Sequence, residues 1–239
     1  MRTAAKYVAG GAALAALGYA AYASATWARY GHPARARTPE EQDPLLDRFM
    51  PLYDIVERHH IHVAAPADIT LSAARELNVF DSCVARAMFK GREIVLGARP
   101  SDNELPPGLL PAALSLGWGI LADQAGREIV LGAVTKPWEP NPVFRDLLPH
   151  EFATFAEPGY VKIAWTLRAD PVAAGESIFR TETRAIATDA AARAKFRRYW
   201  ALVSTGVTLI RRAMLGPVKA DAERRVASLT VTPEMVTIS

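Results

Sequence analysis

The stretch RHHIH at residues 58–62 holds three of the five histidines of the protein, His59, His60 and His62. An imidazole can ligate a metal, transfer protons or serve as an ordinary polar side chain. The surrounding sequence DIVERHHIHV alternates as a β-strand does, and successive side chains of a strand point to opposite faces. The inward face is predicted to carry the apolar residues Ile55, Ile61 and Val63.

A metal site is not expected from these histidines. His60 and His62 share a face, but that face also carries Arg58, and no third ligand is indicated by the spacing. The pair His150-Glu151 does not begin an HExxH motif, because position 154 is Thr. We therefore predict no metal and no cofactor, and the sequence has no GxSxG, P-loop, GxGxxG or CxxC motif.

Glu57 and His59 have the parity of the inward face, where polar side chains need partners. The strand-like sequence SIFRTET places Ser177, Thr181 and Thr183 on one face, where they could meet this pair. Glu57 and His59 could then act as acid and base or hold the polar head of a ligand. The alternative is a pair at the edge of the sheet, hydrated or bonded to backbone.

The N-terminal segment contains 22 consecutive uncharged residues, 7–28, preceded by Arg2 and Lys6. At ~1.5 Å per helical residue this run is long enough for a bilayer core of ~30 Å. Residues 1–30 are accordingly predicted to anchor the protein in a membrane through a single helix. The small-x-small pattern ending at Ala25 leaves cleavage of a signal peptide, and export, as the alternative.

The remaining elements follow from hydrophobic periodicity and turn residues. Pro66 ends the first strand, Asp68 can cap a helix, and a second helical stretch is expected from Ser82. Strands are predicted at 116–124, 126–135, 159–170 and 176–188, and a long helix from 189 that Gly216-Pro217 interrupt. The alternating charges Arg180, Glu182 and Arg184 indicate a solvated face, and the proline-rich segments 98–115 and 137–158 indicate irregular structure.

Charge and composition exclude some kinds of function and some kinds of site. The formal net charge is +3, and five of the 28 Lys and Arg lie before residue 38, where no acid occurs. The rest of the chain therefore has 23 basic against 25 acidic residues, so nucleic-acid binding is not expected. The single cysteine, Cys83, excludes an intrachain disulfide and a cysteine-based zinc site.

The order of elements resembles the SRPBCC or START-like helix-grip superfamily. The resemblance is carried by HIHVAAPADITLSAARELN, YVKIAWTLRAD, SIFRTETRAIAT and the helix from Asp189. It implies an α+β fold in which a curved antiparallel sheet wraps around a long C-terminal helix. The predicted organisation is a linker at 31–50, a helix-grip domain at 51–225 and a tail at 226–239, although five strands are found where the family has six or seven.

The resemblance also implies an apolar cavity between the sheet and the C-terminal helix. Binding or carriage of a hydrophobic small molecule or lipid near the membrane is therefore the predicted function, with no known protein partner. The expected ligand-binding residues, which could equally be ordinary core, are Trp118, Trp165, Phe179, Thr181, Thr183 and Trp200. The alternatives are a cyclase or hydratase using Glu57 and His59, and an interaction module whose core is filled. The loop 135–144 is either a structural connection or a rim at which Trp138 touches ligand or membrane.

Overall fold

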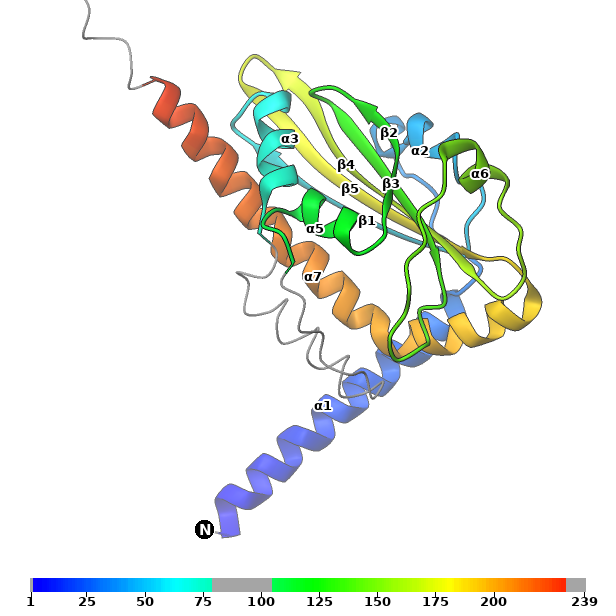
Figure 1. Cartoon of the computed structure of the whole chain (residues 1–239). Coiled ribbons are helices and arrows are strands. Elements are labelled where there is room, and N and C mark those ends of the chain that lie inside the picture. The colour runs from blue at the N-terminus through cyan, green and yellow to red at the C-terminus, as the bar shows by residue number, and fades with distance from the viewer. Residues whose placement is uncertain (1, 79–104, 231–239) are drawn as a thin grey trace, which may run out of the picture.

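The computed structural model describes residues 2–78 and 105–230, which are built around a five-stranded antiparallel sheet (Figure 1). The strands lie in the order β1-β5-β4-β3-β2. Their bounds are β1 Ile55–Val63, β2 Gly119–Gln124, β3 Glu128–Thr135, β4 Val161–Ala173 and β5 Glu176–Ala187. Each coincides with a predicted segment, so the α+β fold with an antiparallel sheet is confirmed. The helical stretch expected from Ser82, with Cys83, lies outside the described residues.

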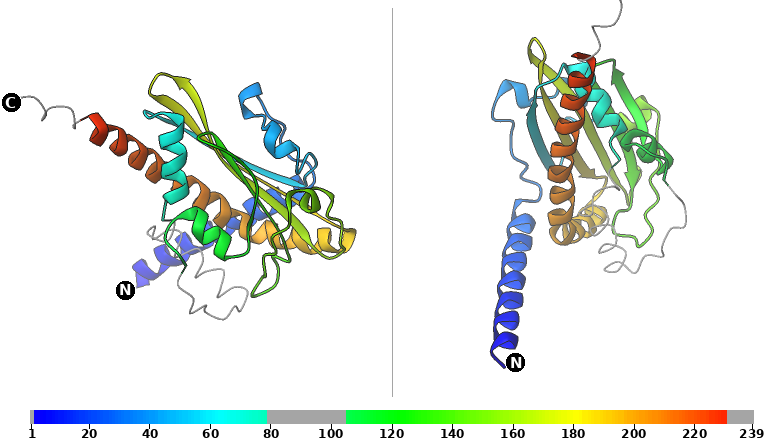
Figure 2. Two further views of the ribbon diagram at one scale, coloured as in Figure 1. Left: turned by 45° about the horizontal axis from the view of Figure 1, so that its top comes forward. Right: turned by 90° about the vertical axis from the view of Figure 1, so that its left-hand side faces the viewer.

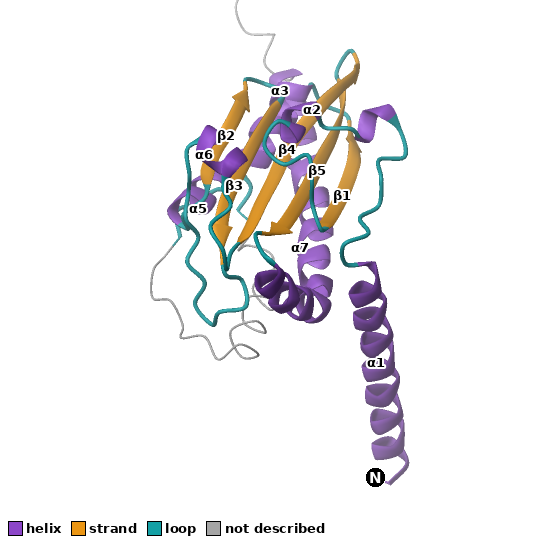
Figure 3. Ribbon diagram, turned by 90° about the vertical axis from the view of Figure 1, so that its right-hand side faces the viewer, coloured by secondary structure: helices purple, strands orange, loops and turns teal. Residues whose placement is uncertain are grey.

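Helices cover both faces of this sheet (Figures 2 and 3). The bounds of the helices are α1 Arg2–Arg29, the 3-10 helix η1 Pro39–Glu41, α2 Pro44–Asp47, α3 Ala67–Glu76, α5 Leu109–Ser115, α6 Pro149–Thr154 and α7 Ala190–Thr230. Helices α3, α5 and α7 lie on the face here called inner, and α2 and α6 on the outer face. The proline-rich segments expected to be irregular therefore contain the short helices α5 and α6.

The long C-terminal helix is confirmed, but it does not stop at Gly216-Pro217 as predicted. Helix α7 has 41 residues and continues through Pro217. Proline leaves the carbonyl four residues earlier without its helical donor, which normally breaks or kinks a helix. Val218 and Ala222, just beyond it, are completely buried in the inner core. Tertiary packing therefore holds the helix across a residue that disfavours it.

Strand β3 is buried along its whole length, because a hydrophobic cluster lies on each face of the sheet. The inner cluster contains Trp165, Phe179 and Val218, and the outer cluster contains Leu46 and Phe152. A Cβ atom at Gly132 of β3 would lie 2.5 Å from Cδ1 of Leu121 and 3.0 Å from a ring carbon of Phe152. Glycine at this position therefore allows α6 to pack closely on the sheet.

The charged face of β5 is not solvated, and that prediction is wrong. Glu182 and Arg184 are 5% and 2% exposed. Glu182 accepts hydrogen bonds from Arg58 and Arg184 at 2.9 and 2.6 Å, and Arg184 also donates to Asp47 and to the Met50 carbonyl. The segment 42–53, predicted to be mostly linker, covers these residues. The alternating charges of β5 therefore belong to a buried network of ion pairs and hydrogen bonds.

The predicted membrane anchor is also wrong. Within residues 2–78 and 105–230, no helix is long and apolar enough to cross a membrane. The uncharged run consists mainly of Ala and Gly, whose small side chains contribute little apolar surface, and it has only two Leu. The N-terminal part of α1 projects away from the sheet (Figure 1), and its C-terminal end contacts α7, where Arg197 donates to the Trp27 carbonyl at 2.9 Å.

Candidate functional site

An apolar cavity of about 320 Å³ lies where α7 passes over the inner face of the sheet. Helix α7 contributes a stripe at helical spacing, and α5 closes the adjoining side with small and aliphatic residues. The loop after β3 and strand β4 provide the remaining wall. The principal lining residues are Val203, Val207, Ile210 and Met214 of α7, Leu109, Ala112 and Ala113 of α5, Leu116 directly after it, and Trp118, Pro137, Pro142, Phe144 and Trp165.

The aromatic part of this wall is fixed by close packing. Trp118 stacks on Phe144 with ring centroids 5.1 Å apart and meets Trp165 edge-on at 5.9 Å. Gly117 precedes Trp118 with φ +93°, and a Cβ there would lie 2.2 Å from the Phe144 carbonyl oxygen. Residue 117 must therefore be glycine for the two chain segments to come close enough for the Trp118 and Phe144 rings to stack.

The predicted ligand-binding residues have different environments. Trp118 and Trp165 line the cavity, whereas Phe179 is fully buried in the adjacent core. Trp200 packs with Phe196 in a separate cluster near the end of α1. In the loop 135–144, Trp138 packs against that same cluster, and Pro137, Pro142 and Phe144 reach the cavity instead.

Glu57 and His59 meet the threonines of β5, as strand parity predicts. Glu57 pairs with Thr183 and His59 with Thr181 in the antiparallel ladder. The Nε2 atom of His59 lies 3.5 Å from Glu57 Oε2, and Thr208 of α7 donates to that same oxygen at 3.4 Å. The Thr181 and Thr183 hydroxyls are buried without a hydrogen-bond partner in the described part of the chain.

This polar cluster and the apolar cavity are neighbouring sites. Among the described lining residues of the cavity, neither Glu57 nor His59 occurs. Arg211 connects the two sites, since it lines the cavity and its charge interacts with Glu57. The Arg211 guanidinium carbon lies 4.8 Å from the Trp165 ring centroid, a cation–π contact. Burial lowers the pKa of Arg211 to about 10, and the Glu57 charge acts in the opposite direction.

Sequence reasoning missed Arg211. Its position is one residue beyond Ile210 of the apolar stripe and four beyond Val207, so it can reach the inward face of α7. That spacing was the available signal. The long arginine side chain can lie along apolar surface while its head reaches a polar neighbour, which hides such residues from hydrophobic pattern analysis.

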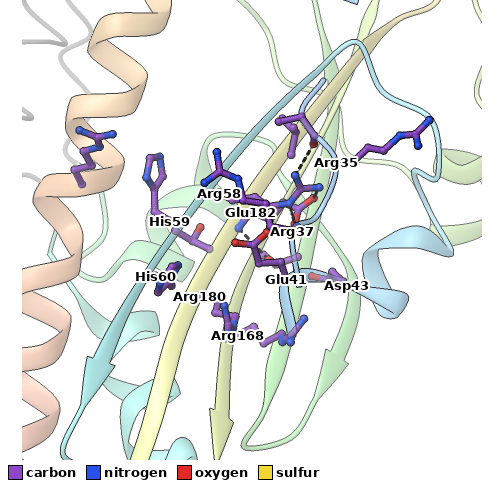
Figure 4. Close-up of a pocket in the computed structure, with 15 residues that line it drawn as sticks. Arg35, Arg37, Glu41, Asp43, Arg58, His59, His60, Arg168, Arg180 and Glu182 are labelled. Carbon is purple, nitrogen blue, oxygen red and sulfur yellow. Dashed lines mark hydrogen bonds and ion pairs between the residues drawn. The ribbon is translucent and has the colours of Figure 1, made fainter. Parts of the chain in front are cut away.

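A second, polar pocket of about 420 Å³ lies chiefly on the outer face (Figure 4). Several of its arginines are already bonded to the protein. Arg58 meets Glu182, Arg180 donates to Asp170 at 2.9 Å, and Arg168 donates to the carbonyls of Glu40 and Gln42 at 2.9 and 2.7 Å. The Arg168 contacts hold the segment before β1 on the sheet, and the other two join neighbouring strands, so these arginines have structural roles.

The histidines on the outer face are exposed. His62 lies 3.2 Å from Glu176, and both side chains are about half exposed. His60 is also exposed and lines the polar pocket. In the parts of the chain that the structure describes, no group of three His, Cys, Asp or Glu side chains is arranged to hold a metal ion.

Comparison with known proteins adds structural resemblances. No protein family matches the chain, and no curated protein matches it. Hypothetical protein jhp0584 from Helicobacter pylori has 8% identity and a TM-score of 0.35, covering 79% of this chain and 96% of that chain. The Zhui aromatase/cyclase from Streptomyces sp. R1128 has 18% identity and a TM-score of 0.28, covering 72% and 94%.

A third resemblance is to the di-domain ARO/CYC BexL from the BE-7585A biosynthetic pathway. It has 18% identity and a TM-score of 0.26, covering 75% of this chain and 48% of that chain. Likeness at this level extends no activity to the present protein. The helix-grip description rests on its own sheet and long C-terminal helix.

Proposed function

We propose that this protein belongs to the helix-grip superfamily and binds or carries a hydrophobic small molecule or lipid in the cavity under α7. The observation that carries the proposal is a void of about 320 Å³ with a mostly apolar lining. Ligand pockets span about 300–1,000 Å³ and are lined mainly by hydrophobic and aromatic side chains with a few polar groups. The described lining of the cavity has this composition, and Arg211 is the charged residue within it.

The affinity would come from removing apolar ligand surface from water. Burial contributes about 25 cal/mol per Å², less the cost of ordering the ligand and the wall. The rings of Trp118, Phe144 and Trp165 are already fixed by one stacked and one edge-on contact, so the ordering cost on this side of the cavity is small. An interaction module with a filled core would not need such a void, so the void favours a ligand.

Native mass spectrometry of the full chain, purified gently from the cells that make it, tests the proposal. We expect a reproducible mass above that of the polypeptide, which disappears when the same sample is denatured. The denatured sample serves as the control for covalent modification. A bare polypeptide mass in every gentle preparation would count against carriage of a tightly bound molecule.

A further inference from the structure

Arg211 is a cation at the wall of an apolar cavity, and no described residue accepts a hydrogen bond from it. It is partly buried on α7, and no hydrogen bond or ion pair to its guanidinium is found among the described residues. Its contact is the face of Trp165, which binds the charge but accepts none of the five N–H donors as an oxygen would. Because the guanidinium is only partly withdrawn from water and no described group accepts from it, its N–H donors remain available to a ligand oxygen.

Glu57 does not supply that partner. Thr208 donates a hydrogen bond to its carboxylate at 3.4 Å, and His59 Nε2 lies 3.5 Å from it without a hydrogen bond. No ion pair within 4 Å joins Glu57 to Arg211. Glu57 therefore acts on Arg211 only through longer-range charge, although burial works against the cation. The guanidinium fork is left available to an oxygen anion in the cavity, for which two parallel N–H···O bonds are the preferred geometry.

We propose that the ligand is an amphipathic acid whose anionic head group is bound by Arg211 while its apolar body occupies the cavity. This inference rests on the proposed function. The head group is a carboxylate or a phosphate, since both fit the guanidinium fork. At roughly 30 Å³ per water-sized group, the cavity holds about ten non-hydrogen atoms, the size of octanoate.

Isothermal titration of the full chain with octanoate, octyl phosphate and octanol at pH 8 tests the inference. The three probes share an alkyl body and differ in the head group. We expect at least one acid to bind about tenfold or more tightly than octanol, because a charged hydrogen bond contributes about 1.5–3 kcal/mol. The two acids distinguish a carboxylate ligand from a phosphate ligand.

Arg211→Met keeps an unbranched apolar side chain and removes the cation. We expect this variant to lose the preference for the acid and to retain octanol binding. Arg198→Met removes the same charge from an exposed position on α7 and should behave as the unmodified protein does. Circular dichroism confirms that both variants are folded, and the probe comparison on the unmodified protein does not depend on any variant.

The outcomes separate the two proposals. Equal or weaker binding of both acids relative to octanol, unchanged in Arg211→Met, overturns the anionic head group and leaves the hydrophobic cavity standing. Failure of all three probes to bind the unmodified protein contradicts the proposed function, and the inference falls with it.

Discussion

At the scale of single residues, burial in the outer core determines whether the carboxyl of Glu128 is protonated. Glu128 begins β3 and is 4% exposed, near Asp43 and Arg168. Burial, with the neighbouring Asp43 carboxylate, raises the Glu128 pKa from 4.5 to about 9. The folded protein therefore keeps a proton that the unfolded chain releases. The associated stability is fully present below pH 4.5 and is lost as the pH rises towards 9.

Glu128→Gln replaces the protonated carboxyl by a neutral group of similar shape. Between pH 5 and pH 9, we expect the free energy of unfolding of the variant to fall less than that of the unmodified protein. At pH 9 the variant should be more stable than the unmodified protein by roughly 1–3 kcal/mol. Urea unfolding at pH 5, 7 and 9 measures this. Exposed Glu139→Gln is the matched control. Identical pH dependence in the Glu128 variant and the unmodified protein would show that Glu128 titrates normally.

Strand parity predicts some of the site at this scale. The alternation in β1 is sufficient to place Glu57 and His59 opposite the threonines of β5. Arg211 could not be found in the same way, because its role depends on Trp165, which is distant in sequence. Trp200 is an aromatic residue of the α7 stripe, but its part of the helix packs with Tyr30 and Ile55 and not at the cavity. Side-chain partners across elements depend on tertiary packing that no local pattern encodes.

At the scale of elements, α7 combines the cavity wall with a residue that disfavours helix. Gly216 and Pro217 are exposed in its interior, and Val218 beyond them is buried. Proline in a helix interior costs about 3 kcal/mol relative to Ala, and glycine costs about 1 kcal/mol. Packing of the last turns on the inner core offsets these costs. Because of this offset the helix continues through Gly216-Pro217, where the sequence predicts an interruption.

Pro217→Ala should stabilise the protein. We expect a gain of about 1–3 kcal/mol in the free energy of unfolding, reduced somewhat because proline also restricts the unfolded chain. Gly216→Ala provides the comparison, with an expected gain of about 0.5–1 kcal/mol and open space for the new methyl group. Urea denaturation midpoints measure both variants. A loss of stability in Pro217→Ala would mean that the proline shapes α7 in a way the fold requires.

The charged alternation of β5 shows what strand patterns leave undetermined. The pattern reports which side chains share a face, and it was correct for Glu182 and Arg184. It could not report that the segment 42–53 folds back over that face, because this contact joins residues far apart in the chain. The five strands, in contrast, follow from local alternation and turns, so they could be predicted.

At the scale of the whole molecule, Asp54 joins three parts of the chain. Its carboxylate accepts hydrogen bonds from the Tyr30 hydroxyl, which follows α1, and from the backbone of Ala187 at the end of β5, both at 3.2 Å. It also lies 2.9 Å from Arg193 of α7. Burial and the nearby carboxylate together raise the pKa of Tyr30, so the hydroxyl stays a donor. The N-terminal helix is thereby tied to the sheet and to α7.

Asp54→Asn should weaken this junction. We expect a loss of about 1–3 kcal/mol in the free energy of unfolding, because a buried charged acceptor is replaced by a neutral one. Amide hydrogens in the last turn of α1 should also exchange faster, which hydrogen exchange with mass spectrometry detects. Asp146→Asn, at an exposed position, controls for the change of charge. Unaltered exchange at the end of α1 would indicate that other contacts hold the helix.

If the space under α7 is a ligand cavity, a large side chain placed inside it should prevent the ligand from binding. Val207 lines the cavity, whereas Leu209 on the same helix is 47% exposed. The measurement is isothermal titration of the full chain with octanol, a neutral probe of the size that the cavity holds, comparing Val207→Trp with Leu209→Trp. We expect saturable binding to the unmodified protein and to Leu209→Trp, and loss of binding in a folded Val207→Trp. Probe binding of unchanged affinity in Val207→Trp would show that the space under α7 is not where the ligand binds.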